Sequence, residues 1–286
     1  MRRSVKYANS AEFVRALESE VHSHSSGDDL LLSELTNDIS LERLVSRLDA
    51  ETTAVKGGFS VRTLIKPSPY TQDVDLLVDS PSMQQLSKEK AHNEIVELIV
   101  DQITAPGEDY FRFKPTMKAM FEDLRPDQAV ARIWVEAQID DKVLGKVVID
   151  AGIKAKDIPT DRIKGRDVLG FADIPNPVIT TVAREYLIAD KITLFLESGF
   201  EGKRPRDVVH AALLLAAGSY KRDLLVRWLD KFGAVRQIAD KLRRPVAEPS
   251  TDWLAAVNEI CRRYALKVDA RSCVNTVSKE LKQLYE

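Results

Sequence analysis

Two aspartates embedded in an aliphatic run, Asp73 and Asp75, constrain this chain more than any other feature of its sequence. Side chains alternate along a β-strand, so both carboxylates lie on one face of a strand whose other face carries Val74, Leu76 and Val78. Two negative charges at this spacing repel each other unless a cation lies between them. Mg²⁺ is a hard cation that prefers one or two carboxylates together with phosphate oxygens. The segment therefore predicts a β-strand that holds a magnesium ion.

A Gly-Gly pair and a small hydroxyl residue, Gly57, Gly58 and Ser60, come shortly before this strand. A chain without Cβ atoms lets backbone N–H groups approach a phosphate closely. We expect a turn at the glycines, a short helix over residues 60–65, and a loop with two prolines before the strand. Residues 56–79 therefore predict one half of a site for a metal ion and a phosphate.

The composition is that of a folded protein, since the 286 residues are 44% hydrophobic and can bury the core of one large domain or two modest ones. No apolar run approaches the roughly 20 residues of a membrane helix, and the N-terminus lacks the apolar region of a signal peptide. We therefore expect a cytoplasmic protein without a membrane partner. Cys261 and Cys273 have neither CxxC spacing nor a nearby histidine cluster, so neither a disulfide framework nor a zinc site is predicted.

The net charge of −2 conceals a difference between the two halves of the chain. Residues 1–150 carry 18 Lys and Arg against 26 Asp and Glu, whereas residues 151–286 carry 24 against 18. A basic half beside an acidic, metal-binding half is typical of an enzyme that acts on a polyanion, because cations position phosphates without reading sequence. Solvated helix faces would give the same asymmetry, so both interpretations stay open.

Hydrophobic periodicity predicts strands in the first part of the chain and helices in the second. A hairpin is expected with arms at residues 131–139 and 143–153 and a turn at Asp140 and Asp141. The helices that we expect cover residues 9–23, 30–50, 83–103, 181–198, 205–217, 219–243, 250–266 and 269–285.

Asp150 interrupts the aliphatic second arm of this hairpin. A lone aspartate at a strand end often forms a turn. Asp150 is also the third acidic residue embedded in a strand, which makes it a candidate third carboxylate for a metal ion or a candidate base.

A lysine and an aspartate stand out in the helical part. Lys191 projects from the same apolar stripe as Leu187 and Phe195, so it either extends to water or points towards an anion. Asp207 lies in the first turn of a helix that Pro205 begins, where a negative charge is favourable against the helix dipole. Taken singly, both residues have a sufficient structural explanation.

Taken in order, four segments resemble a known family: KGG, then DVD in a strand, then EYLIADKITLFL, then RPRDVV. Together they resemble the AbiEii/AbiGii group of minimal nucleotidyltransferases, which are the toxins of bacterial toxin–antitoxin and abortive-infection systems. The resemblance spans residues 41–218. It implies an α+β, polymerase-β-like nucleotidyltransferase fold, with a small mixed sheet and flanking helices in a domain at residues 1–178 and a helical lobe at residues 179–286.

The resemblance also implies roles for the residues of the first part. Gly57, Gly58 and Ser60 would line the triphosphate of a bound NTP. Asp73 and Asp75 would hold Mg²⁺. Asp150 as a third metal ligand is an addition by analogy with related polymerase folds.

In the second part, Lys191 would meet the nucleotide phosphates and Asp207 would complete the site from its helix. We therefore expect the active site to be a cleft between the acidic sheet and the basic helical lobe. The sequence departs from the group at His210, because members often carry an acidic residue three places after the aspartate.

The activity that the resemblance implies is transfer of a nucleoside monophosphate from an NTP to a hydroxyl, with release of pyrophosphate. Relatives add nucleotides to the 3′ end of tRNA, so an RNA acceptor and a cognate antitoxin are the expected partners, without reading of DNA sequence. Two alternatives are a protein hydroxyl as acceptor and a nucleotide-binding module without turnover. The candidate phosphate contacts are Lys154, Lys156, Lys164, Arg166, Lys203, Arg204, Arg206, Arg243, Arg244, Arg262 and Arg263.

Thr71 would share the face of Asp73 and Asp75 if the strand extends back that far. Phosphorylation there would add roughly −1.5 to −2 charges beside the carboxylates and repel the NTP. Thr71 is therefore a candidate regulatory phosphosite. A turn threonine without a regulatory role is the other interpretation.

Overall fold

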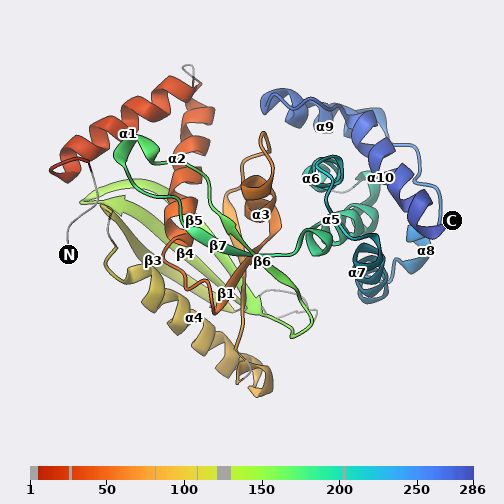
Figure 1. The fold of residues 1–286 in the computed structure, drawn as a ribbon, viewed down its shortest axis with the longest axis horizontal. Helices are drawn as coiled ribbons and strands as arrows, with labels where there is room; N and C mark the ends of the chain where they lie inside the picture. The colour runs from red at the N-terminus through yellow and green to blue at the C-terminus, as the bar shows by residue number, and fades with distance from the viewer. Residues whose placement is uncertain (1–5, 26–27, 81, 108, 121–129, 202–203) are drawn as a thin grey trace. The chain divides into compact units, whose positions relative to one another are not determined.

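The computed structural model describes residues 6–25, 28–80, 82–107, 109–120, 130–201 and 204–286. The chain forms two compact units, the first comprising Met1–Phe59 and Tyr70–Thr181 and the second comprising Ser60–Pro69 and Val182–Glu286. The first unit contains the sheet and the second is helical, so the fold is α+β (Figure 1). Residues 60–69, which the sequence placed in the first domain, group with the helical unit.

Seven strands form one sheet within the described residues, in the order β3-β4-β5-β2-β1-β7-β6 (Figure 1). The sheet is mixed, because β2 runs parallel to β5 and β1 parallel to β7, whereas the pairs β1–β2, β3–β4 and β4–β5 are antiparallel. This confirms the expected mixed sheet. The strands are β1 (Thr53–Lys56), β2 (Asp73–Val78), β3 (Phe111–Met120), β4 (Ala131–Ile139), β5 (Lys142–Ile153), β6 (Thr160–Lys164) and β7 (Val178–Val182).

Alternation of side chains determines which face of the central strands is buried. Along β4, every odd-numbered residue is buried and every even-numbered residue is half-exposed. Along β2, Val74, Leu76 and Val78 are completely buried, whereas Asp73 is exposed and Asp75 half-buried. The strand bounds and the two faces that the sequence predicted for residues 73–78 are thus confirmed.

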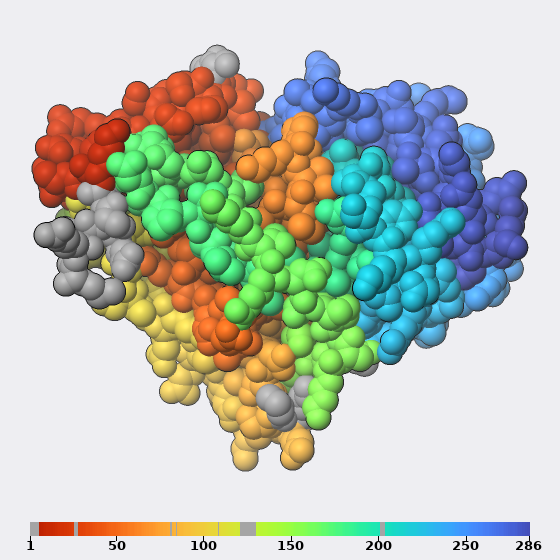
Figure 2. Space-filling model, viewed as in Figure 1, coloured from red at the N-terminus to blue at the C-terminus, as the bar shows by residue number. Residues whose placement is uncertain are grey.

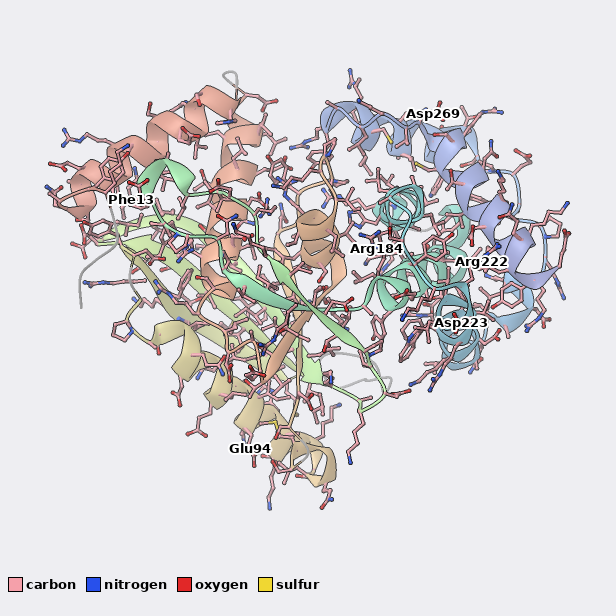
Figure 3. The ribbon with its side chains drawn as sticks, in the orientation of Figure 1. Phe13, Glu94, Arg184, Arg222, Asp223 and Asp269 are labelled. Carbon is pink, nitrogen blue, oxygen red and sulfur yellow. The ribbon has the colours of Figure 1, made fainter. Side chains whose placement is uncertain are left out.

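Three of the first unit's helices pack around this sheet: α1 (Ser10–Ser25), α2 (Asp29–Val45) and α4 (Lys88–Thr104). Asp28 caps α2 by accepting hydrogen bonds from two backbone amides, and Ser87 caps α4. Phe13 of α1, labelled in Figure 3, is fully buried against the rings of Tyr110 and Phe111. The helices predicted at residues 9–23 and 83–103 are present, and α2 ends earlier than expected.

The second unit contains a series of helices after β7, as the pattern predicted. The expected helix at residues 219–243 is interrupted, because Gln237 takes a left-handed conformation with φ of 58° and the Ile238 amide bonds back to the Gly233 carbonyl at 2.8 Å. Asp269, labelled in Figure 3, begins the last helix with a reciprocal capping box to Ser272. The helices are α5 (Arg184–Ser198), α6 (Pro205–Ala216), α7 (Arg222–Val235), α8 (Ala239–Leu242), α9 (Thr251–Arg263) and α10 (Ala270–Tyr285).

Four strands were not predicted, namely β1, β3, β6 and β7. Residues Gly170–Ala172 form a short 3-10 turn. No helix in the described part of the chain has both the length and the apolar character that a membrane span requires.

Candidate active site

A row of four charged residues crosses the centre of the sheet. The strand registers place Lys56 of β1 opposite Asp75 of β2, Asp75 opposite Asp150 of β5, and Asp150 opposite Arg132 of β4. Directly opposed residues share a face of a sheet. Two carboxylates are therefore flanked by a cation on each side, and Asp73 lies one side-chain repeat away from Asp75 on the same face.

Arg132 is joined to Asp150 by two hydrogen bonds. Its Nε donates to Oδ1 at 2.7 Å and its Nη2 donates to Oδ2 at 2.6 Å, so both oxygens of Asp150 are engaged. These bonds raise the pKa of Arg132 above its ordinary value, partial burial opposes the rise, and the charges of Asp150, Asp73 and Asp75 add to it. Arg132 is therefore a permanent cation beside the three carboxylates.

Gly57 lies directly against the carboxylate of Asp75. A Cβ at this position would come within 1.9 Å of the Asp75 Oδ2 atom, and the backbone has φ of 69°, a conformation that side chains disfavour. Gly57 is also the first residue of α3 (Gly57–Leu64), which follows β1 without a loop. The expected glycine turn is thus the start of the helix itself, so the N-terminus of α3 lies beside Asp75.

Gly58 and Ser60 continue α3. Ser60 is only 1% exposed and lies three residues after Gly57. Their predicted role at the triphosphate remains a prediction.

Thr71 lies outside β2, which begins at Asp73, so the alternation of the strand does not reach it. It contacts the site by another route, since its hydroxyl donates to Asp73 Oδ1 at 2.7 Å. Thr71 is buried, with 8% of its surface exposed. The hydroxyl thus holds the Asp73 carboxylate in place.

Asp73 and Asp75 have the chemistry to hold a divalent ion. Within the described residues there is no group of three or more His, Cys, Asp or Glu residues arranged to hold a metal. Asp73 and Asp75 nevertheless present carboxylate oxygens from one face of β2, one of them exposed, which suits an ion that takes its remaining ligands from phosphate and water. Asp150 is less open to such an ion, because both of its oxygens accept hydrogen bonds from Arg132.

The helical unit holds the second group of predicted residues. Lys191 of α5 and Asp207 of α6 form a buried ion pair, with Lys191 Nζ 3.2 Å from Asp207 Oδ1 and each side chain 9% exposed. Lys191 Nζ is also 3.7 Å from Asp190 Oδ2, and Arg236 holds Asp190 at 2.8 Å. Lys191 therefore does not extend to water but is held between two carboxylates.

His210 lies one turn after Asp207 on α6 and is 5% exposed. Neither ring nitrogen has a hydrogen-bond partner among the described residues. Burial, with the charges of Lys191 and Arg206 added, lowers the pKa of His210 to about 3. The imidazole is therefore neutral at ordinary pH, in a position where the resembling group often carries an acid.

The basic residues of the predicted RNA surface fall into two classes. Arg166 is 6% exposed and is paired with Asp38 and Glu42, so it belongs to the interior of the first unit and not to a phosphate-binding surface. Lys154 is largely covered and lies 2.8 Å from Asp79. Lys203 lies outside the described residues. The other candidates are exposed: Lys156, Lys164, Arg204, Arg206, Arg243, Arg244, Arg262 and Arg263.

Sequence reasoning missed Arg132, Lys56 and Arg236. The alternation of polar and apolar residues in β4 marks Arg132 as a member of the polar face. Its pairing with Asp150 depends on the strand register.

The family model described as "Nucleotidyl transferase AbiEii toxin, Type IV TA system" matches residues 39–264. The chain belongs to this family. This AbiEii-family protein is thus a nucleotidyltransferase of the toxin type, and the matched segment includes the carboxylate row, Gly57, Lys191 and Asp207. A search of the curated proteins found no match.

A solved structure shows the same fold. The nucleotidyltransferase toxin MenT4 from Mycobacterium tuberculosis superposes with a TM-score of 0.55 at 14% identity, covering 94% of this chain and 99% of that one. JHP933 from Helicobacter pylori gives a TM-score of 0.48 at 14% identity, covering 88% of this chain and 91% of that one. At this identity the likeness to MenT4 concerns the fold.

Proposed function

We propose that this AbiEii-family enzyme transfers a nucleoside monophosphate from an NTP to the 3′-terminal hydroxyl of tRNA, and so inhibits translation and growth. The observation that carries the proposal is the close approach of Gly57 to Asp75, which puts a helix N-terminus and two carboxylates together. A helix N-terminus favours phosphate, and paired carboxylates suit a divalent ion. The basic second half of the chain suits a polyanionic acceptor.

In the proposed reaction the acceptor hydroxyl oxygen forms a bond to the α-phosphorus, and the bond from that phosphorus to the β-phosphate oxygen breaks. Pyrophosphate leaves, and the hydroxyl proton is released. Mg²⁺ held by Asp73 and Asp75 would supply charge stabilisation to the phosphoryl oxygens and lower the pKa of the hydroxyl. The backbone N–H groups of Gly57 and Gly58 would orient the triphosphate.

Lys191 is proposed to contact the phosphates and to offset the negative charge of the leaving pyrophosphate. Its ion pairs with Asp207 and Asp190 fix the direction of the ammonium group inside the helical unit. Asp207 is proposed to act through Lys191. A cognate antitoxin is the proposed protein partner, in keeping with the description of the family as toxins of type IV systems.

The test is one set of reactions with four NTPs, each labelled at the α-phosphate, with Mg²⁺ and either total tRNA or a protein lysate. We expect label in tRNA from one or two of the NTPs. Label that appears only in protein would contradict the RNA acceptor and support nucleotidylylation of a Ser, Thr or Tyr hydroxyl.

Thr71 is retained as a proposed control point of the same site. A Thr71→Glu variant places a negative charge where the hydroxyl now contacts Asp73, so we expect nucleotide transfer to fall by at least about tenfold. Thr71→Val, which removes the hydrogen bond without adding charge, is the matched control and should retain more activity. Full activity of Thr71→Glu in the labelled-NTP assay would exclude regulation by phosphorylation.

A further inference from the structure

A groove on the helical unit, separate from the residues of the proposed reaction, has the properties of an RNA-binding surface. It is a cavity of about 430 Å³ between residues 242–246, at the end of α8 and just after it, and the last turns of α10. We call it the α10 groove. Residues 270–286 are deep blue in Figure 2 and lie on the surface in that view.

Positive charge dominates the walls of the α10 groove. Arg243 and Arg244 line one side and Lys279 and Lys282 the other, and all four are exposed. Glu286 is the one carboxylate among the residues that line the cavity, all of which the structure describes. A concave surface with several cations concentrates phosphate groups, because its field is stronger than that of isolated surface charges.

The ion pairs that these cations make are of the weak, exposed kind. Arg243 lies 3.3 Å from Asp230 and Arg244 lies 3.2 Å from Asp240. Lys282 lies 3.6 Å from Glu286. Exposed pairs contribute little net stability, so phosphate oxygens can replace these carboxylates at small cost.

Lys279 makes no hydrogen bond or ion pair within the described part of the chain and is already exposed on the wall of the groove.

The groove also offers planar and apolar surface. The Arg243 guanidinium lies 4.8 Å from the ring centre of Tyr285, and the Tyr285 hydroxyl donates to Asp230 at 2.9 Å, so ring and guanidinium are held together. Leu242, Pro245 and Val246 contribute apolar lining. Proteins that hold single-stranded RNA combine such stacking surfaces with cations that follow the backbone.

A second, smaller cavity of about 160 Å³ extends the groove towards the start of α10. It shares Val246 and Ser278 with the first and adds Arg271, Asn275 and one carboxylate, that of Glu248. The two cavities thus follow α10, whose 16 residues span roughly 24 Å. This length suits a strand of several nucleotides better than a single small anion.

We propose that the α10 groove binds the sugar-phosphate backbone of the RNA acceptor, through Arg243, Arg244, Lys279 and Lys282. The inference rests on the proposed function in one respect, that the acceptor is RNA. It assigns a binding surface outside the residues that handle the nucleotide.

The test measures binding of fluorescent total tRNA to the full chain without NTP, over a range of salt concentrations. The variant is the double substitution Lys279→Glu with Lys282→Glu. The matched control is Lys88→Glu with Lys90→Glu, which makes the same change of charge on exposed residues of α4 outside the groove. Binding of the NTP is measured separately for each protein.

We expect the groove variant to bind tRNA at least about tenfold more weakly and to lose about 1.5 from the slope of log affinity against log salt, whereas the control changes less than about threefold. NTP binding should be unchanged in both.

Equal loss in both variants would show a diffuse charge effect and overturn the assignment. Wild-type affinity in the groove variant would also overturn it and leave the proposed function intact. If the wild type binds an acidic polypeptide as tightly as tRNA, and the groove variant loses both equally, the surface fits an acidic protein partner and the RNA assignment is wrong. Wild-type protein that binds no tRNA would refute both the assignment and the RNA acceptor.

Discussion

Single residues set the geometry of the proposed nucleotide site. Gly57 is the clearest case, because two separate constraints act on it, a positive φ and the contact with Asp75. The sequence predicted that glycine was needed there for a close approach to phosphate. The structure adds that the carboxylate itself leaves no space for a side chain.

A Gly57→Ala variant should therefore lose transfer activity in addition to the stability that a strained backbone costs. Its Cβ would displace the Asp75 carboxylate, so we expect transfer activity to fall by about 100-fold or more, with a loss of about 1–3 kcal/mol in the free energy of unfolding. Gly218→Ala is the matched control, because Gly218 has φ of 65° and nothing within 4 Å of the added Cβ. It should lose stability but not activity. Similar activity losses in the two variants would contradict the contact argument.

His210 gives the folded chain a specific sensitivity to acid. Its pKa is about 3 in the folded state and about 6.5 when exposed, so the unfolded state binds the extra proton between these values. Stability should therefore fall as pH decreases below about 6.5, by up to about 1.4 kcal/mol per pH unit.

A His210→Leu variant removes this sensitivity. Between pH 7 and pH 5 it should lose about 2 kcal/mol less in its free energy of unfolding than the wild type, measured by urea unfolding. His24→Leu, at an exposed position of α1, should retain the wild-type dependence. An unchanged pH dependence in His210→Leu would show that the imidazole is not held neutral.

At the scale of elements, a strand could be predicted from sequence only where its own residues carry a long alternating pattern of polar and apolar side chains. The strand at residues 73–78 and the hairpin arms were predicted with nearly the observed bounds, because alternation over six or more residues is a strong pattern. β1, β6 and β7 have only four or five residues each and depend on their partners in the sheet.

The pairing of Arg132 with Asp150 shows a further limit. A two-residue turn with regular pairing would place Arg132 opposite Ile149. A bulge between Ala137 and Gln138 in the register shifts the pairing by one residue and brings Asp150 opposite Arg132. A single extra residue thus decides whether Asp150 meets a cation, and no local signal in the sequence marks it.

This arrangement predicts how the carboxylates would respond to loss of the cation. An Arg132→Gln variant frees both oxygens of Asp150, so direct calorimetric titration should show Mg²⁺ binding about tenfold tighter than in the wild type. The double variant Arg132→Gln with Asp150→Asn should return towards wild-type affinity. Unchanged affinity in Arg132→Gln would exclude Asp150 as a potential metal ligand.

At the scale of the whole molecule, family membership was predictable because four motifs occur in order, although each is weak alone. Arg166 shows what such motifs leave out. In the sequence, Arg166 is one of many cations in the basic half of the chain, but in the structure it is buried and paired with Asp38 and Glu42. Burial raises the pKa of Glu42, and the charge of Arg166 opposes that rise. Its role follows from long-range packing that no spacing along the chain encodes.

The central claim is that Asp75 and Lys191 serve one nucleotidyl transfer reaction. The most direct measurement follows label from NTP into tRNA, with the label at the α-phosphate in one reaction and at the γ-phosphate in the other. We predict incorporation of the α-label alone, and a loss of at least about 100-fold in both Asp75→Asn and Lys191→Gln. Wild-type rates in either variant, or incorporation of the γ-label, would contradict the claim.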